Sequence, residues 1–319
     1  PWPRWLVDVY SAEMARLVRD EVSKGTYQLV IASQVSTTPY TLALKGVARL
    51  FEEIEVTVYR EQFAKQAPWW KRARYGLTWL KLVGYLRRAR RAFDGCTVVS
   101  SIEAAHVEKA APAGAPIRVV PNGVDVAAYA GDFGRPEADT LIYPGALSYT
   151  ANYDAAAWFA DEILPLVAAS RPGVEFKITG GTEGIDLNGF ADTEHVRFTG
   201  YLDDIRPAIA CSWACVVPLR VGGGTRLKIL EAMALGTPVV STFKGAEGLE
   251  VTHGRDILLA DEPEEFAQAV VRLLGDERLR ASLADAGRRL VESRYDWPRV
   301  GEELLQFVAE IGVSAHVVK

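Results

Sequence analysis

Residues 213–241 read WACVVPLRVGGGTRLKILEAMALGTPVVS. An apolar run leads into Gly222, Gly223 and Gly224, and a stretch of good helix formers follows. Glycine lets a ligand approach the backbone closely, and the first turn of a helix presents N–H groups that have no partner within the helix. This strand, loop and helix therefore predict a binding site for an anion.

The charged side chains that follow the glycines fit the same interpretation. Arg226 and Lys228 place two cations in the first helical turn, where the helix dipole disfavours them unless an anion such as a phosphate is bound. Glu231 lies three residues beyond Lys228 on the same helix face, where a carboxylate can accept two hydrogen bonds from a ribose diol. The alternative is a glycine turn that merely connects a strand to a helix, with Arg and Lys on the surface.

Strands and helices alternate along most of the chain. Apolar residues recur at helical spacing in residues 11–24, 154–169 and 264–274, which are the predicted helices. Short apolar runs, which suit strands buried on both faces of a parallel sheet, occupy residues 27–33, 96–100, 117–120, 140–143, 174–179, 196–199, 213–217, 238–241 and 257–259. Such alternation predicts right-handed βαβ units, so the expected fold class is α/β, with open parallel sheets covered by helices on both faces.

A boundary between two domains is predicted near residue 135. An apolar run ends in Pro121-Asn122-Gly123, and a polar stretch with glycines and a proline follows at 130–136. We therefore expect a first domain in residues 1–135 and a second in residues 136–296. The second has enough strands for a complete Rossmann-like sheet, whereas the first has fewer strands and opens with a helix. Another helix is expected after Trp297.

The composition is that of a soluble globular protein. Of 319 residues, 49% are hydrophobic and 24% are charged, which excludes the disordered and collagen-like classes. Cys96, Cys211 and Cys215 are too few for a disulfide framework and suggest a reducing compartment, so we expect a cytoplasmic protein. Neither they nor the four histidines have metal-ligand spacing, and we expect no metal and no cofactor. The chain begins at Pro1 without an initiator Met, and we expect it to be cut from something longer.

One segment, residues 60–91, carries a charge opposite to that of the whole chain, whose formal net charge is −5. It holds ten Lys or Arg residues and one acid, Glu61, and its aromatic residues interleave with the cations: Trp69, Trp70, Tyr75, Trp79 and Tyr85. This pattern predicts a basic helix on an anionic membrane surface, which would make the protein peripheral on the cytoplasmic face of the membrane. The alternative is a solvated helix whose aromatic residues pack on their own domain. Nucleic acid is not expected as a partner, because no recognition motif accompanies the charge.

Several segments together resemble the family-4 (group 1) glycosyltransferases, which have the GT-B fold of two Rossmann-like domains. The glycine stretch from Pro218 to Pro238 is similar to the donor-binding segment of that family. The other similar segments are PNGVD at 121–125, YPGAL at 143–147, NYDA at 152–155, GYLDDIR at 200–206 and GAEGL at 245–249. Together they cover about residues 95–296, in the order that the family has them.

The resemblance implies retaining transfer of a hexose from a UDP- or GDP-sugar to a glycan or a lipid-linked acceptor. The second domain would bind the nucleotide-sugar, with Glu231 at the ribose. The other donor-binding residues would be Gly145, Gly222, Gly223, Gly224 and Thr225. Arg226 and Lys228 would be the catalytic residues, because they can stabilise the charge that develops on the departing diphosphate.

The sequence departs from the family pattern at three places. The first Glu of the family's E-x7-E motif would fall at Gly223 and is missing, so backbone N–H groups would have to hold the sugar hydroxyls. The basic residue often found near the start of the donor domain is not evident, since Ala146 and Asn152 stand there. The usual opening strand and glycine-rich loop are missing too, so the N-terminal domain is expected to be incomplete, and the helix in residues 297–319 would cross back to it.

The alternative to glycosyl transfer is a non-catalytic nucleotide- or sugar-binding module, left by loss of the N-terminal half-domain. A dehydrogenase is disfavoured, because no G-x-G-x-x-G motif follows the first strand of either domain. An acidic run at 52–55 can meet an acceptor hydroxyl if it ends a strand, although a solvated acidic turn is favoured over that role.

Overall fold

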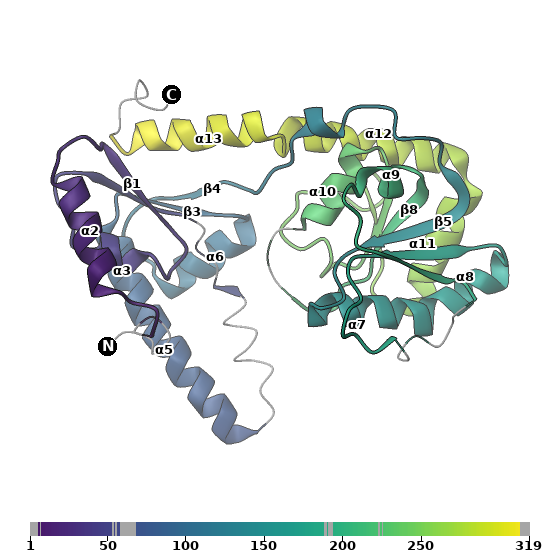
Figure 1. Cartoon of the computed structure of the whole chain (residues 1–319), viewed down its shortest axis with the longest axis horizontal. Coiled ribbons are helices and arrows are strands. Elements are labelled where there is room, and N and C mark those ends of the chain that lie inside the picture. The colour runs from purple at the N-terminus through teal and green to yellow at the C-terminus, as the bar shows by residue number, and fades with distance from the viewer. Residues whose placement is uncertain are drawn as a thin grey trace. The chain divides into compact units, whose positions relative to one another are not determined.

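The computed structural model describes residues 6, 8–52, 54, 56, 57, 68–187, 190, 194–222, 224 and 226–312. The chain divides into two compact units. Unit 1 comprises Pro1–Pro121 and Val300–Lys319, and unit 2 comprises Asn122–Arg299. Each unit is built on a parallel sheet that is flanked by helices (Figure 1).

Within its described residues, unit 1 contains a four-stranded parallel sheet in the order β1-β2-β3-β4. The strands are β1 (Leu29–Ser33), β2 (Ala48–Glu52), β3 (Gly95–Val98) and β4 (Ile117–Val119). The helices are α2 (Ala12–Val22), α3 (Thr38–Thr41), α5 (Trp69–Ala92) and α6 (Ser101–Ala110). Serine side chains define where α2 and α6 begin, because Ser11 Oγ and Ser100 Oγ each accept a hydrogen bond of 3.2 Å from the backbone N–H three residues later.

The end of the chain supplies part of the core of unit 1. In α13 (Trp297–Glu310), Phe307 and Val308 are buried and form a cluster with Leu50 of β2. A Cβ built on Gly95 would lie 2.9 Å from the Phe307 ring, so only glycine lets the helix approach β3 this closely. The helix that was expected at the C-terminus thus packs on the first sheet through Leu304, Phe307 and Val308.

The described part of unit 2 forms a six-stranded parallel sheet in the order β10-β9-β8-β5-β6-β7. Its strands are β5 (Glu137–Pro144), β6 (Glu175–Thr179), β7 (Val196–Gly200), β8 (Ser212–Val217), β9 (Val239–Ser241) and β10 (Leu258–Leu259). One face is covered by α7 (Thr150–Trp158), η2 (Phe159–Ile163), α8 (Leu164–Ser170) and α11 (Pro263–Gly275). The other face is covered by α9 (Arg206–Ala210), α10 (Leu227–Ala234) and α12 (Glu277–Arg294), and a short helix, η1 (Val126–Tyr129), precedes β5.

Both faces of this sheet are covered, which explains why its strands read as continuous apolar runs. Residues 214–217 of β8 have no exposed surface at all. The order of the strands also determines which face each helix covers. The chain moves from β5 to β6 in one direction across the sheet and from β8 to β9 in the other, so right-handed crossovers place α7 and α10 on opposite faces. The α/β fold class predicted from the sequence is confirmed.

The boundary between the units lies at Pro121, so the residues from Asn122 to the expected boundary near 135 belong to unit 2. The reason is a pair of backbone hydrogen bonds that the hinge segment, residues 122–130, makes within unit 2. Val124 N donates to Tyr295 O at 2.8 Å, and Trp297 N donates to Val124 O at 3.1 Å. The expected boundary rested on the polar stretch at 130–136. The backbone pairing at Val124 lies before that stretch, so unit 2 begins earlier.

The helix predicted over residues 154–169 is longer and is not uniform. It runs as α7, η2 and α8 from Thr150 to Ser170, with a π-helical turn in the middle. Pro165 has no N–H to donate to the carbonyl four residues earlier, which accounts for a widened turn directly before it.

Candidate functional site

The glycine turn after β5 makes room for a lysine from another helix. A Cβ built on Gly145 would lie 3.0 Å from Lys228 Nζ and 3.0 Å from Asn152 Cγ. Both distances are shorter than an ordinary van der Waals contact, so a larger residue would displace one of these groups. Gly145 thereby allows Lys228 of α10 and Asn152 of α7 to meet at the carboxyl end of β5.

Lys228, Asn152 and Tyr143 form a hydrogen-bonded cluster. Lys228 Nζ donates to Asn152 Oδ1 at 3.0 Å and to the Tyr143 hydroxyl at 3.1 Å, and that hydroxyl donates to Asn152 Oδ1 at 2.9 Å. The ammonium also lies 4.3 Å from the centroid of the Tyr143 ring, which is a cation–π contact. An ammonium has three N–H donors, and described residues use two of them, so the third can bind an anion.

The surroundings of Lys228 change how readily it loses its proton. Burial lowers the pKa of Lys228 to about 8, and the nearby positive charge of Arg226 acts in the same direction. Burial also raises the pKa of Tyr143 well above its ordinary value, so the phenol keeps its proton and donates to Asn152. At pH 7 the Lys228 ammonium is therefore charged and poorly solvated, and such a cation interacts strongly with a phosphate.

Glu231 lies further along α10 and contacts the hinge segment. The Tyr129 hydroxyl donates a hydrogen bond of 3.0 Å to Glu231 Oε1. Burial raises the pKa of Tyr129 to about 12, with a further contribution from the negative charge of Glu231, so the phenol is the donor. Asp125 places Tyr129, because its Oδ1 accepts from Ala128 N at 3.2 Å and caps η1.

Two glycines of the loop between β8 and α10 have backbone angles that favour glycine. The φ angles are +103° at Gly222 and +83° at Gly224. A Cβ on Gly222 would lie 3.4 Å from Ala151 Cβ, so this loop runs close to the start of α7. The other two predicted loop residues, Gly223 and Thr225, lie outside the described residues.

Arg226 holds the glycine loop against a neighbouring loop. Its side chain is only 6% exposed, and its Nη2 donates to Gly222 O at 3.0 Å and to Lys244 O at 3.1 Å. The same nitrogen lies 4.0 Å from Glu247 Oε2, within the GAEGL segment after β9. The guanidinium therefore fixes the shape of the loop through backbone carbonyls, whereas the Lys228 ammonium contacts β5 and α7.

The start of the same loop is tied to α7 by an ion pair. Arg220 donates to both carboxylate oxygens of Asp154, at 2.7 Å and 3.2 Å, and its guanidinium lies 4.9 Å from the Trp158 ring. Paired bonds of this kind restrict the orientation of the guanidinium. The loop is thus anchored at Arg220 and again at Arg226, on either side of its glycines.

The structure brings some of the predicted site residues together and adds others. Gly145 and Lys228 meet, and Glu231 lies one helical turn beyond Lys228. The sequence showed no basic residue near Asn152, but the structure brings the Lys228 ammonium of α10 next to it. Sequence reasoning did not select Tyr143 or Tyr129 as site residues. Tyr143 stands in the YPGAL segment, but no local pattern marks Tyr129.

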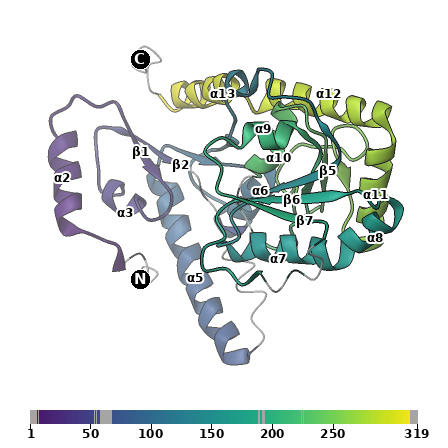
Figure 2. The same cartoon turned by 45° about the vertical axis from the view of Figure 1, so that its right-hand side comes forward.

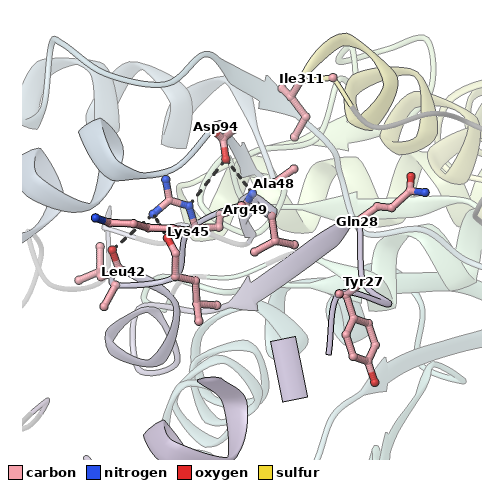
Figure 3. A pocket seen from close by; sticks show the side chains of 14 residues that line it. Tyr27, Gln28, Leu42, Lys45, Ala48, Arg49, Asp94 and Ile311 are labelled. Carbon is pink, nitrogen blue, oxygen red and sulfur yellow. Dashed lines mark hydrogen bonds and ion pairs between the residues drawn. The ribbon is translucent and has the colours of Figure 1, made fainter. Parts of the chain in front are cut away.

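Unit 1 contains a cavity of about 920 Å³, shown in Figure 3. It opens at the amino ends of the strands, where Gln28, Ala48 and Asp94 lie just before or at the start of β1, β2 and β3. Arg49 crosses it and is held in place, with its backbone N–H donating to Asp94 Oδ2 at 2.8 Å and its Nη1 to Leu44 O at 3.2 Å. Ligands of parallel α/β sheets bind at the carboxyl ends of strands, so this cavity is not the predicted site.

At the carboxyl end of the first sheet, the acidic run is only partly described. Glu52 ends β2, and its Oε2 accepts from Ser33 Oγ at 2.8 Å, whereas Glu53 and Glu55 lie outside the described residues. A second carboxylate, Glu103, is buried and accepts from the backbone N–H groups of residues 56 and 57 at 3.0 and 3.2 Å. Glu103 is thus occupied in holding the chain after β2.

No group of three or more His, Cys, Asp and Glu side chains in the described ranges is arranged to hold a metal ion. Of the helices that the structure describes, none combines the length and the apolar character that crossing a bilayer requires.

The second unit matches a known family. Residues 138–276 match the family described as Glycosyl transferases group 1, which confirms the resemblance that the motifs indicated. The phosphatidyl-myo-inositol mannosyltransferase of Mycolicibacterium smegmatis is 31% identical over 212 residues, which cover 62% of this chain and 54% of that protein. The GDP-mannose-dependent monoacylated alpha-(1-6)-phosphatidylinositol monomannoside mannosyltransferase of Corynebacterium glutamicum is 29% identical over 153 residues, covering 44% and 40%. The chain thus spans about half the length of these relatives or less.

Solved structures show the fold over nearly the whole chain. Anabaena Alr3699/HepE in complex with UDP and glucose superposes with a TM-score of 0.70 over 93% of this chain and 80% of that chain, at 16% identity. Sucrose-phosphate synthase from Thermosynechococcus elongatus gives a TM-score of 0.69 over 93% and 77%, at 17% identity. These similarities establish the GT-B fold.

Proposed function

We propose that this chain, whose residues 138–276 match the family of group 1 glycosyl transferases, acts as a retaining hexosyltransferase that uses a UDP- or GDP-sugar. The observation that carries the proposal is the Lys228 ammonium, held 3.0 Å from Asn152 Oδ1 beside Gly145. It lies on the same helix as Glu231, one turn away. A cation and a carboxylate at this spacing suit the diphosphate and the ribose of one nucleotide.

In the proposed reaction, the bond between the anomeric carbon and the diphosphate oxygen breaks, and its electron pair goes to that oxygen. Lys228 stabilises the developing negative charge through its remaining N–H, together with the N-terminus of α10. Arg226, the second predicted catalytic residue, acts by holding the loop of Gly222 and by adding positive charge nearby. An acceptor hydroxyl forms the new bond on the same face of the sugar and passes its proton to the departing diphosphate oxygen, so the configuration is retained.

In this proposal, unit 2 binds the donor and unit 1 contributes to the acceptor side. The relatives named above are described as mannosyltransferases whose names include phosphatidylinositol compounds, and one is described as GDP-mannose-dependent. Those names support a lipid-linked acceptor here, with a glycan as the other class. A lipid-linked acceptor also fits a protein that is cytoplasmic and peripheral on a membrane through residues 60–91.

The test is transfer from radiolabelled GDP-mannose and UDP-glucose to a lipid extract and to oligosaccharides. The chain should incorporate label from one donor, and Lys228→Met should abolish incorporation while Lys109→Met, on an exposed face of α6, leaves it unchanged. Anomeric configuration of the product, read by NMR, checks retention. No incorporation, in an assay where a verified group 1 enzyme works, would contradict the proposal.

The same samples separate transfer from binding alone. A non-catalytic nucleotide-binding module is favoured if calorimetry detects UDP or GDP, Glu231→Ala weakens that binding, and no label is transferred. The expected weakening is about tenfold to a hundredfold, the usual cost of leaving hydrogen-bonding groups without a partner.

A further inference from the structure

The two halves of α5 differ in how they contact unit 1. In its second half, one side faces the core, where Leu82, Tyr85, Leu86 and Ala89 are buried. Its first half extends beyond the other elements of unit 1, as Figures 1 and 2 both show. Helical spacing continues the buried side of the second half along one flank of the first half, so the opposite flank is directed away from the unit 1 core.

That opposite flank carries an apolar stripe. Trp69, Leu77 and Leu80 are 81%, 55% and 67% exposed, and Trp70 is 52% exposed. At about 100° per residue, these four positions fall within an arc of roughly 100°. Large apolar groups that share one arc of a projecting helix are more than the scattered exposed residues of an ordinary surface.

The same flank becomes cationic toward the other end of the helix. Lys81, Arg88 and Arg91 follow on the side of the apolar stripe. Eight of the 24 residues of α5 are Lys or Arg and none is acidic, in a chain whose formal net charge is −5. Within the part of the chain that is described, no carboxylate forms an ion pair with Lys71, Arg74 or these three residues.

We propose that this flank of α5 docks unit 1 on an anionic phospholipid bilayer, with Trp69, Trp70, Leu77 and Leu80 at the level of the headgroups and acyl chains. Lys81, Arg88 and Arg91 contact the lipid phosphates. Tryptophan is suited to the membrane interface, and each Lys or Arg near an anionic surface adds to the attraction. The inference deepens the membrane partner of the proposed function, but it does not require that the chain transfer a sugar.

A bilayer explains this surface better than a second copy of the chain or a nucleic acid. Pairing two copies through this flank would bring Lys81, Arg88 and Arg91 of one copy toward the same cations of the other. A nucleic acid would account for the charge but not for the exposed Leu77 and Leu80, which no phosphate or ribose would cover. A bilayer with anionic headgroups satisfies both the charge and the apolar stripe.

The first test is cosedimentation of the 319-residue chain with sucrose-loaded vesicles. The chain should bind mixed phosphatidylcholine and phosphatidylglycerol vesicles, more weakly as salt rises, and should bind phosphatidylcholine alone poorly. Trp69→Ser with Trp70→Ser should lower partitioning about tenfold. Lys81→Gln, Arg88→Gln and Arg91→Gln together should lower it by at least as much. The matched control is Arg272→Gln, Arg278→Gln and Arg289→Gln, which removes the same charge from exposed positions on α11 and α12 and should change little.

The second test locates the two tryptophans. Lipids brominated on their acyl chains should quench part of the tryptophan fluorescence of the bound chain. Trp69→Phe with Trp70→Phe keeps an aromatic ring at both positions, so it should retain most of the vesicle binding while that quenching disappears.

Equal binding by the α5 variants and the control, or no binding to anionic vesicles, would overturn the proposal. Sedimentation-velocity dimers that Trp69→Ser with Trp70→Ser abolishes would also overturn it and would assign the flank to a second copy. Calorimetry with UDP and GDP on the same variants reports on the donor site separately, so failure of docking and failure of the proposed transfer are distinguishable.

Discussion

The Tyr129 hydroxyl and Glu231 Oε1 are 3.0 Å apart, and this hydrogen bond joins the segment that opens unit 2 to the helix that follows the glycine loop. Tyr129 lies 102 residues before Glu231 in the chain. The carboxylate that the family resemblance assigns to a ribose is therefore oriented by a residue of the hinge segment. Its position depends on how residues 122–130 are held.

Tyr129→Phe should weaken UDP or GDP binding between about threefold and tenfold, because the Glu231 carboxylate loses a hydrogen bond that orients it. Calorimetry measures the change. Tyr153→Phe is the control, since it removes a similar hydrogen bond, to Asp186 O at 2.9 Å, elsewhere in unit 2. Tighter binding by the Tyr129 variant would mean instead that the phenol competes with the ribose.

Gly145→Ala should reduce nucleotide affinity by about tenfold with little loss of stability. The added methyl group would meet Lys228 Nζ and Asn152 Cγ at 3.0 Å and move the ammonium, whereas the fold around it is otherwise unchanged. Gly181→Ala is the matched control in the loop after β6, because a Cβ there meets nothing within 4 Å. Equal nucleotide affinities for the two variants would show that Gly145 does not contribute to the nucleotide site.

Nucleotide binding should weaken as the pH rises through about 8. Burial lowers the pKa of Lys228 to about 8, so at pH 9 most of the free protein lacks the positive charge that a diphosphate needs. Affinity should fall about tenfold between pH 7 and pH 9. In Lys228→Met, calorimetry should find weaker binding at pH 7 and little slope between these two values. A slope as steep as that of the wild type would place the titrating group elsewhere.

Lys228→Met should also make the free protein more stable at pH 7. The pKa of Lys228 is about 8 in the folded state, below its ordinary value of 10.5, so folding works against the charged form at neutral pH. Below pH 8 both states carry the proton and the folded state bears the whole cost, at most about 3 kcal/mol. As the pH rises from 8 to 10.5 that cost disappears, because the folded state loses its proton first.

Urea denaturation at pH 7 and at pH 10.5 measures this difference. The gap in unfolding free energy between Lys228→Met and wild type should be largest at pH 7 and should close at the higher pH. Lys109→Met, on the exposed side of α6, serves as the control and should show no comparable gap. A variant that is less stable than wild type at both values would show that the hydrogen bonds of Lys228 outweigh its desolvation.

Local patterns were enough to predict the sheets but not the cluster around Lys228. Apolar runs such as the one before Pro218 predicted buried parallel strands, and helical spacing over residues 11–24 predicted the helix found as α2. The contact between Lys228 and Asn152 joins positions 76 residues apart, and no spacing within either segment encodes it. It depends on the order of strands in the sheet, which places β5 beside β8.

The role of Arg226 shows the same limit of sequence patterns. Its place at the start of a helix next to three glycines indicated a phosphate-binding side chain, and the same pattern indicated this role for Lys228. Only the packed structure distinguishes them, because Arg226 is buried against the carbonyls of Gly222 and Lys244. The burial of Arg226 and its backbone partners depend on how the loop of Gly222 packs against the loop of Lys244.

The pairing of Leu50 with Phe307 and Val308 bears on the order in which the chain folds during synthesis. Unit 2 is one continuous stretch of the chain, whereas unit 1 needs residues from both before and after it. Leu50, by contrast, emerges early and has to wait for Phe307, more than 250 positions later. During that interval the face of β2 that α13 will cover remains apolar and open, and such transiently exposed surface favours aggregation.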